Sequence, residues 1–176
     1  MNFQKTKILD SYLINLDKIA DDRGFFSRLF CADEFKNKNI SFNFPQVNTS
    51  QTKHKGSIRG FHYQRDNSSE SKLVKCIKGS IYDIVVDIRP NSKTYMKWEG
   101  FELNDINRSM LLIPKGCAHG FQSLEDNIEL IYFVDEKYNP DLESGIRWND
   151  EAFKFNWPLT PTGVSTKDQN WPDYKI

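Results

Sequence analysis

The sequence lacks an excess of either charge, and it lacks long hydrophobic runs. Its 176 residues include 24 Lys or Arg and 24 Asp or Glu, so the formal net charge is zero. This balance argues against binding to nucleic acid or to an anionic membrane through overall charge. No stretch has the apolar length of a signal peptide or a bilayer span. We therefore expect a cytoplasmic protein with neither nucleic acid nor a membrane among its partners.

Cysteine is scarce, and several well-known catalytic motifs are missing. Cys31, Cys76 and Cys117 are far apart and odd in number. This spacing excludes the disulfide framework of small secreted domains and indicates a reducing compartment. The sequence has no Gly-rich phosphate loop, no GxSxG motif and no dinucleotide-binding fingerprint. These absences disfavour P-loop, serine-hydrolase and nicotinamide-dependent functions.

Aromatic residues and turn-forming residues are plentiful. Aromatics make up 14% of the chain, and short alternating segments are separated by Gly, Pro and Asn. This pattern predicts one all-β domain over residues 1–176, a sandwich or barrel with a few short helices. Strands are expected over 8–17, 25–30, 45–51, 57–64, 72–77, 80–89, 97–103, 109–113, 117–124 and 128–134. Short helices are expected over 34–38 and 151–155, capped by Asp33 and Asp150.

The segment 56–64 contains a combination of residues suited to proton transfer. His62 is a possible base and Arg59 is a cation that can hold negative charge, as proton abstraction from carbon requires. Their odd spacing puts them on opposite faces of a flat strand. A bend at Gly60 would bring them together. An ordinary strand with a hydrogen-bonded histidine remains the simpler interpretation of this segment alone.

A second histidine segment, 114–121, carries His119. The two segments together are similar to the histidine-bearing motifs of cupins. A first-row metal needs three or four ligands, and neither histidine has companion ligands nearby in the sequence. We therefore expect no metal and no other cofactor.

Other basic and aromatic residues suit a nucleotide diphosphate, although each has a simpler interpretation. The set suits diphosphate binding and stacking of a base or sugar. It contains Arg23, Arg28, Arg59, Lys72 and Lys167, interleaved with Phe25, Phe26, Tyr132 and Tyr138. Taken singly, the cations are typical of a solvated surface, Tyr132 of a core tyrosine, and Asp168 of a surface turn.

Many sequence blocks together resemble one known family. They are 22–26, 46–48, 58–64, 72–74, 83–89, 113–121, 143–146, 148–150, 157–158 and 165–168, with Tyr132 and Tyr138. From about Ile8 to Pro172 the chain resembles the dTDP-4-dehydrorhamnose 3,5-epimerases, cupin-fold enzymes of L-rhamnose biosynthesis. The resemblance implies a cupin-type jelly roll, a homodimer and an isomerase that supplies deoxysugars for cell-surface polysaccharides such as O-antigen.

The resemblance also implies a role for each site residue. His62 would remove a proton beside the C4 ketone of a nucleotide-diphosphate sugar, and Asp168 would orient His62. Tyr132 would return a proton from the opposite face, and Lys72 would lie near the enolate oxygen. The implied substrate-binding residues are Arg23, Gln46, Asn48, Arg59, His119, Tyr138, Glu143 and Lys167.

Two departures from the family pattern leave alternatives open. Arg28 stands where the family usually has an acidic residue near the base, and an arginine cannot accept a hydrogen bond from a pyrimidine N–H. Met96 stands where glycine is usual. The alternatives are an epimerase of C3 or C5 alone on a CDP- or GDP-linked sugar, a non-catalytic nucleotide-sugar-binding cupin, and a ketoisomerase.

Overall fold

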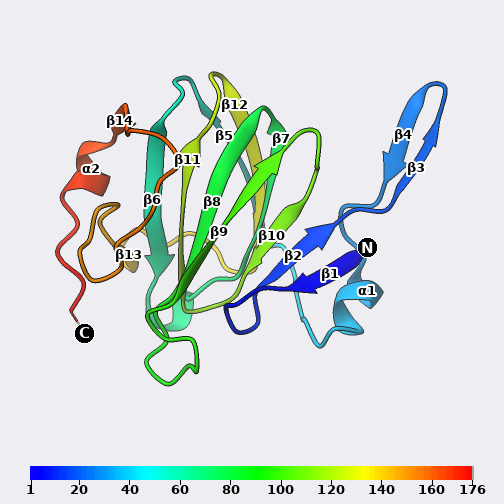
Figure 1. Ribbon diagram of the computed structural model, residues 1–176. Helices are drawn as coiled ribbons and strands as arrows, with labels where there is room; N and C mark the ends of the chain where they lie inside the picture. Colours follow the sequence, from blue (N-terminus) through cyan, green and yellow to red (C-terminus); the bar gives the residue numbers. More distant parts are fainter. Residues whose placement is uncertain (176) are drawn as a thin grey trace.

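Two β-sheets stacked face to face form the body of the protein in a computed structural model that describes residues 1–175 (Figure 1). The first sheet contains, in spatial order, β1 (Asn2–Lys5), β2 (Tyr12–Asn15), β10 (Met110–Ile113), β7 (Lys72–Lys78), β12 (Ile128–Val134) and β5 (Gln46–Thr52). The second contains β13 (Glu143–Gly145), β6 (Ser57–Gln64), β11 (Cys117–Ser123), β8 (Ser80–Asp87) and β9 (Trp98–Asn104), with β14 (Gly163–Val164) parallel to β6. The predicted all-β class is confirmed.

The main hydrophobic core lies between the two sheets. Val74 and Leu130 from the first sheet belong to the same cluster as Ile81, Val85 and Phe121 from the second. Burying a side chain of this size contributes about 1.5–3 kcal/mol. A slip of one residue in the pairing would turn these side chains away from the other sheet, so their burial favours the observed register.

The outer faces of both sheets are also covered. Along β8, Ile84 and Val86 lie on one face, and Asp83 lies on the other. Ile84 and Val86 pack in a cluster with Phe153 from the C-terminal region, on the outer face. The other face is buried as well, because it turns toward the first sheet, and Asp83 is fully buried there. On the first sheet, residues near the N-terminus, including Phe35, cover the outer face.

The helices differ from the prediction. The expected helix over 34–38 is α1 (Ala32–Lys36), which begins after Cys31 and has no side-chain cap. The helix predicted over 151–155 is absent: residues 151–153 form a turn, and the Asp150 carboxylate accepts hydrogen bonds from the Ala152 and Tyr174 N–H groups. Besides a 3-10 turn, η1 (Asp66–Ser68), the structure has α2 (Thr166–Gln169), in a segment where no helix was predicted.

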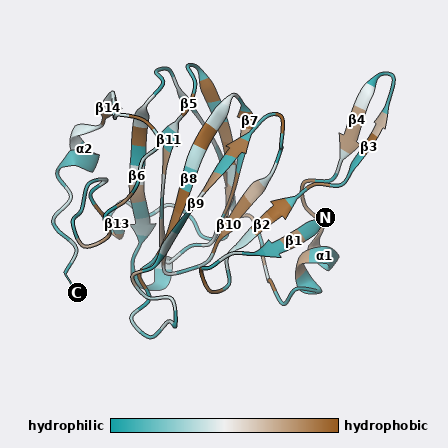
Figure 2. Ribbon diagram, viewed as in Figure 1, coloured by the Kyte–Doolittle hydropathy of each residue, from teal (hydrophilic) through white to brown (hydrophobic). Residues whose placement is uncertain are grey.

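A two-stranded hairpin projects from the sandwich. The segment 8–17 was predicted as one strand, but it contains only β2, and β3 (Lys18–Asp21) then pairs with β4 (Gly24–Ser27). Figure 1 shows this hairpin on the side of the molecule away from α2, and Figure 2 shows hydrophobic residues along it. Ile19 and Phe26 are 72% and 65% exposed. Within residues 1–175, no helix has both the length and the hydropathy needed to cross a bilayer.

Candidate functional site

A bulge in β6 turns Arg59 and His62 toward the same cavity. His62 pairs with His119 and Arg59 with Phe121, so a three-residue step on β6 opposes a two-residue step on β11. Gly60 has φ of +112°, and a Cβ atom there would lie 2.6 Å from the Gly120 Cα atom. The extra residue reverses the alternation, so Arg59 and His62 line one cavity of about 150 Å³. The predicted bend at Gly60 is confirmed.

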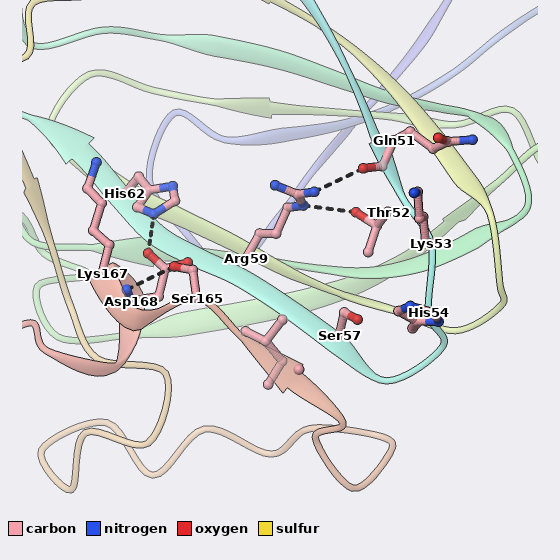
Figure 3. A pocket seen from close by; sticks show the side chains of 12 residues that line it. Gln51, Thr52, Lys53, His54, Ser57, Arg59, His62, Ser165, Lys167 and Asp168 are labelled. Carbon is pink, nitrogen blue, oxygen red and sulfur yellow. Dashed lines mark hydrogen bonds and ion pairs between the residues drawn. The ribbon is translucent and has the colours of Figure 1, made fainter.

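Helix α2 brings Asp168 to His62 (Figure 3). The distance from His62 Nε2 to Asp168 Oδ1 is 2.6 Å, and the Gly60 N–H donates to Asp168 Oδ2 at 3.3 Å. Ser165 caps the helix by accepting a hydrogen bond from the Asp168 N–H. Burial opposes ionisation of the carboxyl group, but the hydrogen bonds from His62 and Gly60 hold the pKa of Asp168 below its usual value. Asp168 is 3% exposed, so its interpretation as a surface-turn residue was wrong.

Lys72 and Tyr132 come from adjacent strands of the first sheet. Lys72 lies opposite Val134 in the β7–β12 ladder, and Tyr132 lies two residues from Val134, so both side chains are on one face. They line a cavity of about 300 Å³ together with His62. Lys72 Nζ donates to the His62 carbonyl at 3.4 Å. Burial raises the pKa of the Tyr132 hydroxyl.

Polar residues surround the outer part of this cavity. Gln46 Nε2 donates to Asn48 Oδ1 at 2.9 Å, and the Tyr138 N–H donates to Gln46 Oε1 at 3.1 Å. The Tyr138 hydroxyl and the Lys167 ammonium group both donate to Glu143 Oε2 at 2.5 Å. The hydrogen bond to Glu143 raises the pKa of Tyr138 to about 12. Burial opposes ionisation of Glu143, but hydrogen bonds from Lys167 and Tyr138 hold its pKa below the usual range.

Arg59 and His119 are held by partners on neighbouring strands. Arg59 donates to Thr52 Oγ1 and to the Gln51 carbonyl, each at 2.9 Å (Figure 3). His119 Nε2 lies 2.5 Å from Oδ1 of the fully buried Asp83. Among the described residues, Asp83 Oδ2 has no hydrogen-bond partner. Hydrogen bonds within the protein therefore orient the Arg59 and His119 side chains.

Arg23 and Arg28 lie outside these cavities. Arg23 is at the tip of the hairpin, where its side chain is 90% exposed and pairs with Asp21. Arg28 Nη1 lies 3.1 Å from Glu34 Oε1, with the Arg28 side chain 59% exposed. The structure thus brings together every predicted site residue except Arg23.

Met96, which stands where the family usually has glycine, adopts φ of +64°, a conformation that glycine adopts more easily.

Sequence reasoning missed two polar residues of the 300 Å³ cavity, Gln64 and Glu70. Glu70 precedes Lys72 by two positions, and residues at this spacing share a face of an extended chain. An acidic residue two positions before a lysine was thus a signal that could have identified Glu70.

Across residues 1–175, no three or more His, Cys, Asp or Glu side chains form a group able to hold a metal ion.

Two stacked antiparallel sheets with a polar cavity between them define the cupin-type class of β-sandwich proteins. The family model for dTDP-4-dehydrorhamnose 3,5-epimerase matches residues 5–175. The chain therefore belongs to this family. The dTDP-4-dehydrorhamnose 3,5-epimerase of Escherichia coli K12 is 40% identical over 171 residues, which cover 96% of this chain and 92% of the relative.

Two solved structures of similar enzymes carry ligands. A Bacillus anthracis dTDP-4-dehydrorhamnose 3,5-epimerase with TDP and PPi bound aligns with a TM-score of 0.95 and 36% identity, covering 98% of this chain and 99% of that one. A Legionella pneumophila dTDP-6-deoxy-D-glucose-3,5-epimerase in complex with dTDP-4-keto-L-rhamnose aligns with a TM-score of 0.90 and 32% identity, covering 99% of both chains.

Proposed function

We propose that this protein is an isomerase that inverts C3 and C5 of a dTDP-linked 4-keto-6-deoxy sugar for deoxysugar biosynthesis. The single observation that carries the proposal is the hydrogen-bonded pair of His62 and the buried Asp168, in which His62 faces a cavity also lined by Lys72 and Tyr132. Family membership and the thymidine-containing ligands of the two solved relatives support the choice of substrate.

His62 acts as the base. When Nε2 is protonated, its N–H group donates a hydrogen bond to the Asp168 carboxylate. The lone pair of Nδ1 is then available to accept the substrate proton. The Asp168 carboxylate then stabilises the imidazolium that forms. A hydrogen next to a ketone is weakly acidic, so the resulting enolate needs a positive group, and the Lys72 ammonium group supplies it.

Tyr132 acts as the acid from the opposite side. His62 belongs to the second sheet and Tyr132 to the first, and both line the cavity between the sheets. A sugar ring bound there has His62 on one side and Tyr132 on the other, which is the arrangement that inversion of a carbon centre requires.

The surrounding residues bind the nucleotide diphosphate and the sugar. Arg59 and Lys167 supply positive charge for the diphosphate, and His119 offers a ring N–H as a hydrogen-bond donor. Tyr138 is 52% exposed and offers a ring for stacking against the base. The remaining substrate-binding residues are Gln46, Asn48 and Glu143.

The working form is a homodimer in the cytoplasm. The hairpin exposes Ile19 and Phe26 and presents Arg23 at its tip, so a second copy can cover the apolar residues and receive Arg23. The described cysteines, Cys31, Cys76 and Cys117, are all free, which suits a reducing compartment.

Incorporation of solvent deuterium tests the proposal. The protein is incubated in D₂O with dTDP-, CDP- and GDP-linked 4-keto sugars, and the label is located by NMR. Label at C3 and C5 of the dTDP sugar with inversion is expected. A binding module incorporates no label, an epimerase of one centre labels C3 or C5 alone, and a ketoisomerase moves the carbonyl group. Each of these outcomes contradicts the proposal, as does preference for CDP or GDP.

A further inference from the structure

A glutamate without an assigned role lies within the 300 Å³ cavity. Glu70 Oε1 is 3.0 Å from Lys72 Nζ, and each of these side chains is 10% exposed. The other carboxylate oxygen, Oε2, accepts a hydrogen bond from Gln64 Nε2 at 3.0 Å. Glu70 lies just before β7 and lines the same cavity as His62 and Tyr132. Both of its oxygens are thus engaged, one of them with the lysine of the reaction site.

We infer that Glu70 is a positioning residue. Its ion pair with Lys72 holds the Lys72 ammonium group in the cavity that His62 and Tyr132 also line. The inference depends on the proposed epimerase function. Lysine has a flexible four-carbon side chain that loses conformational freedom when it is fixed. Besides Glu70, the polar contact that Lys72 Nζ makes within residues 1–175 is the one to the His62 carbonyl, at 3.4 Å. Glu70 therefore provides the stronger restraint.

The Glu70 charge also acts on Tyr132. Burial raises the pKa of Tyr132, and the negative charge of Glu70 raises it further, whereas Arg59 lowers it. A higher pKa keeps the tyrosine protonated, and able to act as an acid, at higher pH. Besides Lys72 and Tyr132 themselves, the charged and titratable groups that line the cavities around them are Arg59, His62 and Tyr63 from β6, His119 from β11, Glu143 from β13, Tyr138 and Glu70.

The test is the variant Glu70→Gln. Glutamine keeps the size of the side chain and an oxygen that accepts from Gln64, but it loses the charge. We expect kcat to fall about 10–100-fold, because misplacing a reacting group by about 1 Å can slow a reaction about 100-fold. We expect little change in KM. The alkaline limb of the kcat/KM profile should move to lower pH, because the pKa of Tyr132 falls.

Two further variants make the test specific. Glu129→Gln is the matched control, since Glu129 pairs with Lys78 on the exposed part of β12 and β7 and should leave kcat and the pH profile unchanged. Glu70→Asp keeps the charge but draws it back from Lys72, so kcat should fall while the alkaline limb stays close to its wild-type position.

A Glu70→Gln enzyme with wild-type kcat and pH profile overturns the inference. If Glu70→Gln does not fold, as judged by thermal melting, Glu70→Asp decides, and an unchanged kcat for that variant overturns the inference. An inactive wild-type protein contradicts the proposed function instead.

Discussion

His62 Nε2 lies 2.6 Å from Asp168 Oδ1, although 106 positions separate the two residues in the chain. The contact forms because β14 runs parallel to β6 and the chain then turns into α2, over the edge of the second sheet. The His62 side chain is 35% exposed and that of Asp168 is 5% exposed. The imidazole is therefore open to the cavity, while its carboxylate partner is shielded from water.

Asp168→Asn should slow proton removal while leaving the fold intact. The amide keeps the shape of the carboxylate but cannot stabilise an imidazolium by charge. We expect deuterium exchange and epimerisation to fall together, by about 10²–10⁴-fold. Exchange rates measured by NMR, with circular dichroism as the folding control, check this. Loss of epimerisation with normal exchange would place Asp168 in a different step.

The same variant should change how stability depends on pH. The folded-state pKa of Asp168 lies below the ordinary value of 3.8, so its ionised form stabilises the protein above pH 3.8. This contribution is lost as the pH falls through the lowered pKa. Urea unfolding should therefore show Asp168→Asn to be less stable than wild type at pH 7, with the difference shrinking in acid. A difference that does not vary with pH would argue against this linkage.

Tyr132→Phe should separate proton removal from inversion. The ring still packs beside the core, but the hydroxyl that donates from the first sheet is gone. His62 can still remove a proton and return a solvent deuteron to the same face. We expect deuterium incorporation with retained configuration and inversion slowed by about 10²–10⁴-fold. Inversion at the wild-type rate would identify Tyr132 as a core tyrosine and make Tyr138 the next candidate.

Gly60→Ala should be strongly destabilising. The new Cβ atom would lie 2.6 Å from the Gly120 Cα atom, and φ of +112° is unfavourable for alanine. We expect a loss of at least about 1–3 kcal/mol in the free energy of unfolding. Gly163→Ala is the control, because its Cβ atom would meet its nearest neighbour, Ser57 Oγ, at 3.3 Å. Equal stability of the two variants would contradict the close packing at the bulge.

Arg23→Ala should weaken substrate binding through the partner subunit. A lost charge-assisted hydrogen bond costs about 1.5–3 kcal/mol, so KM should rise roughly 10–100-fold. In a mixed dimer of Arg23→Ala and His62→Ala chains, one site would combine an intact His62 with an intact Arg23. One intact site out of two should give the mixed dimer about half of the activity of a wild-type dimer. Absence of restoration in a purified mixed dimer would exclude this use of the hairpin.

Local sequence signals predicted the parts of the site that depend on neighbouring residues in the chain. The strand containing His62 and the bend at Gly60 follow from alternation and from the glycine itself. The burial of Asp168 did not follow, because it depends on packing of the C-terminal region against β6. The hydrogen bond between the Tyr174 N–H and the Asp150 carboxylate could not be predicted either, because it joins residues 24 positions apart. The family resemblance identified the cavity residues, but it did not indicate Glu70.

The strand order of the second sheet has a consequence for folding kinetics. Its central strands, β6, β11 and β8, are neighbours in space, although β11 follows the other two at a long distance along the chain. Sheets with such non-local pairing fold in roughly milliseconds to seconds, because long loops must close before the contacts form. The contact between His62 and Asp168 is non-local as well, so we expect catalysis to return late in refolding, after the far-ultraviolet circular dichroism signal. A stopped-flow comparison of the two signals would measure that delay.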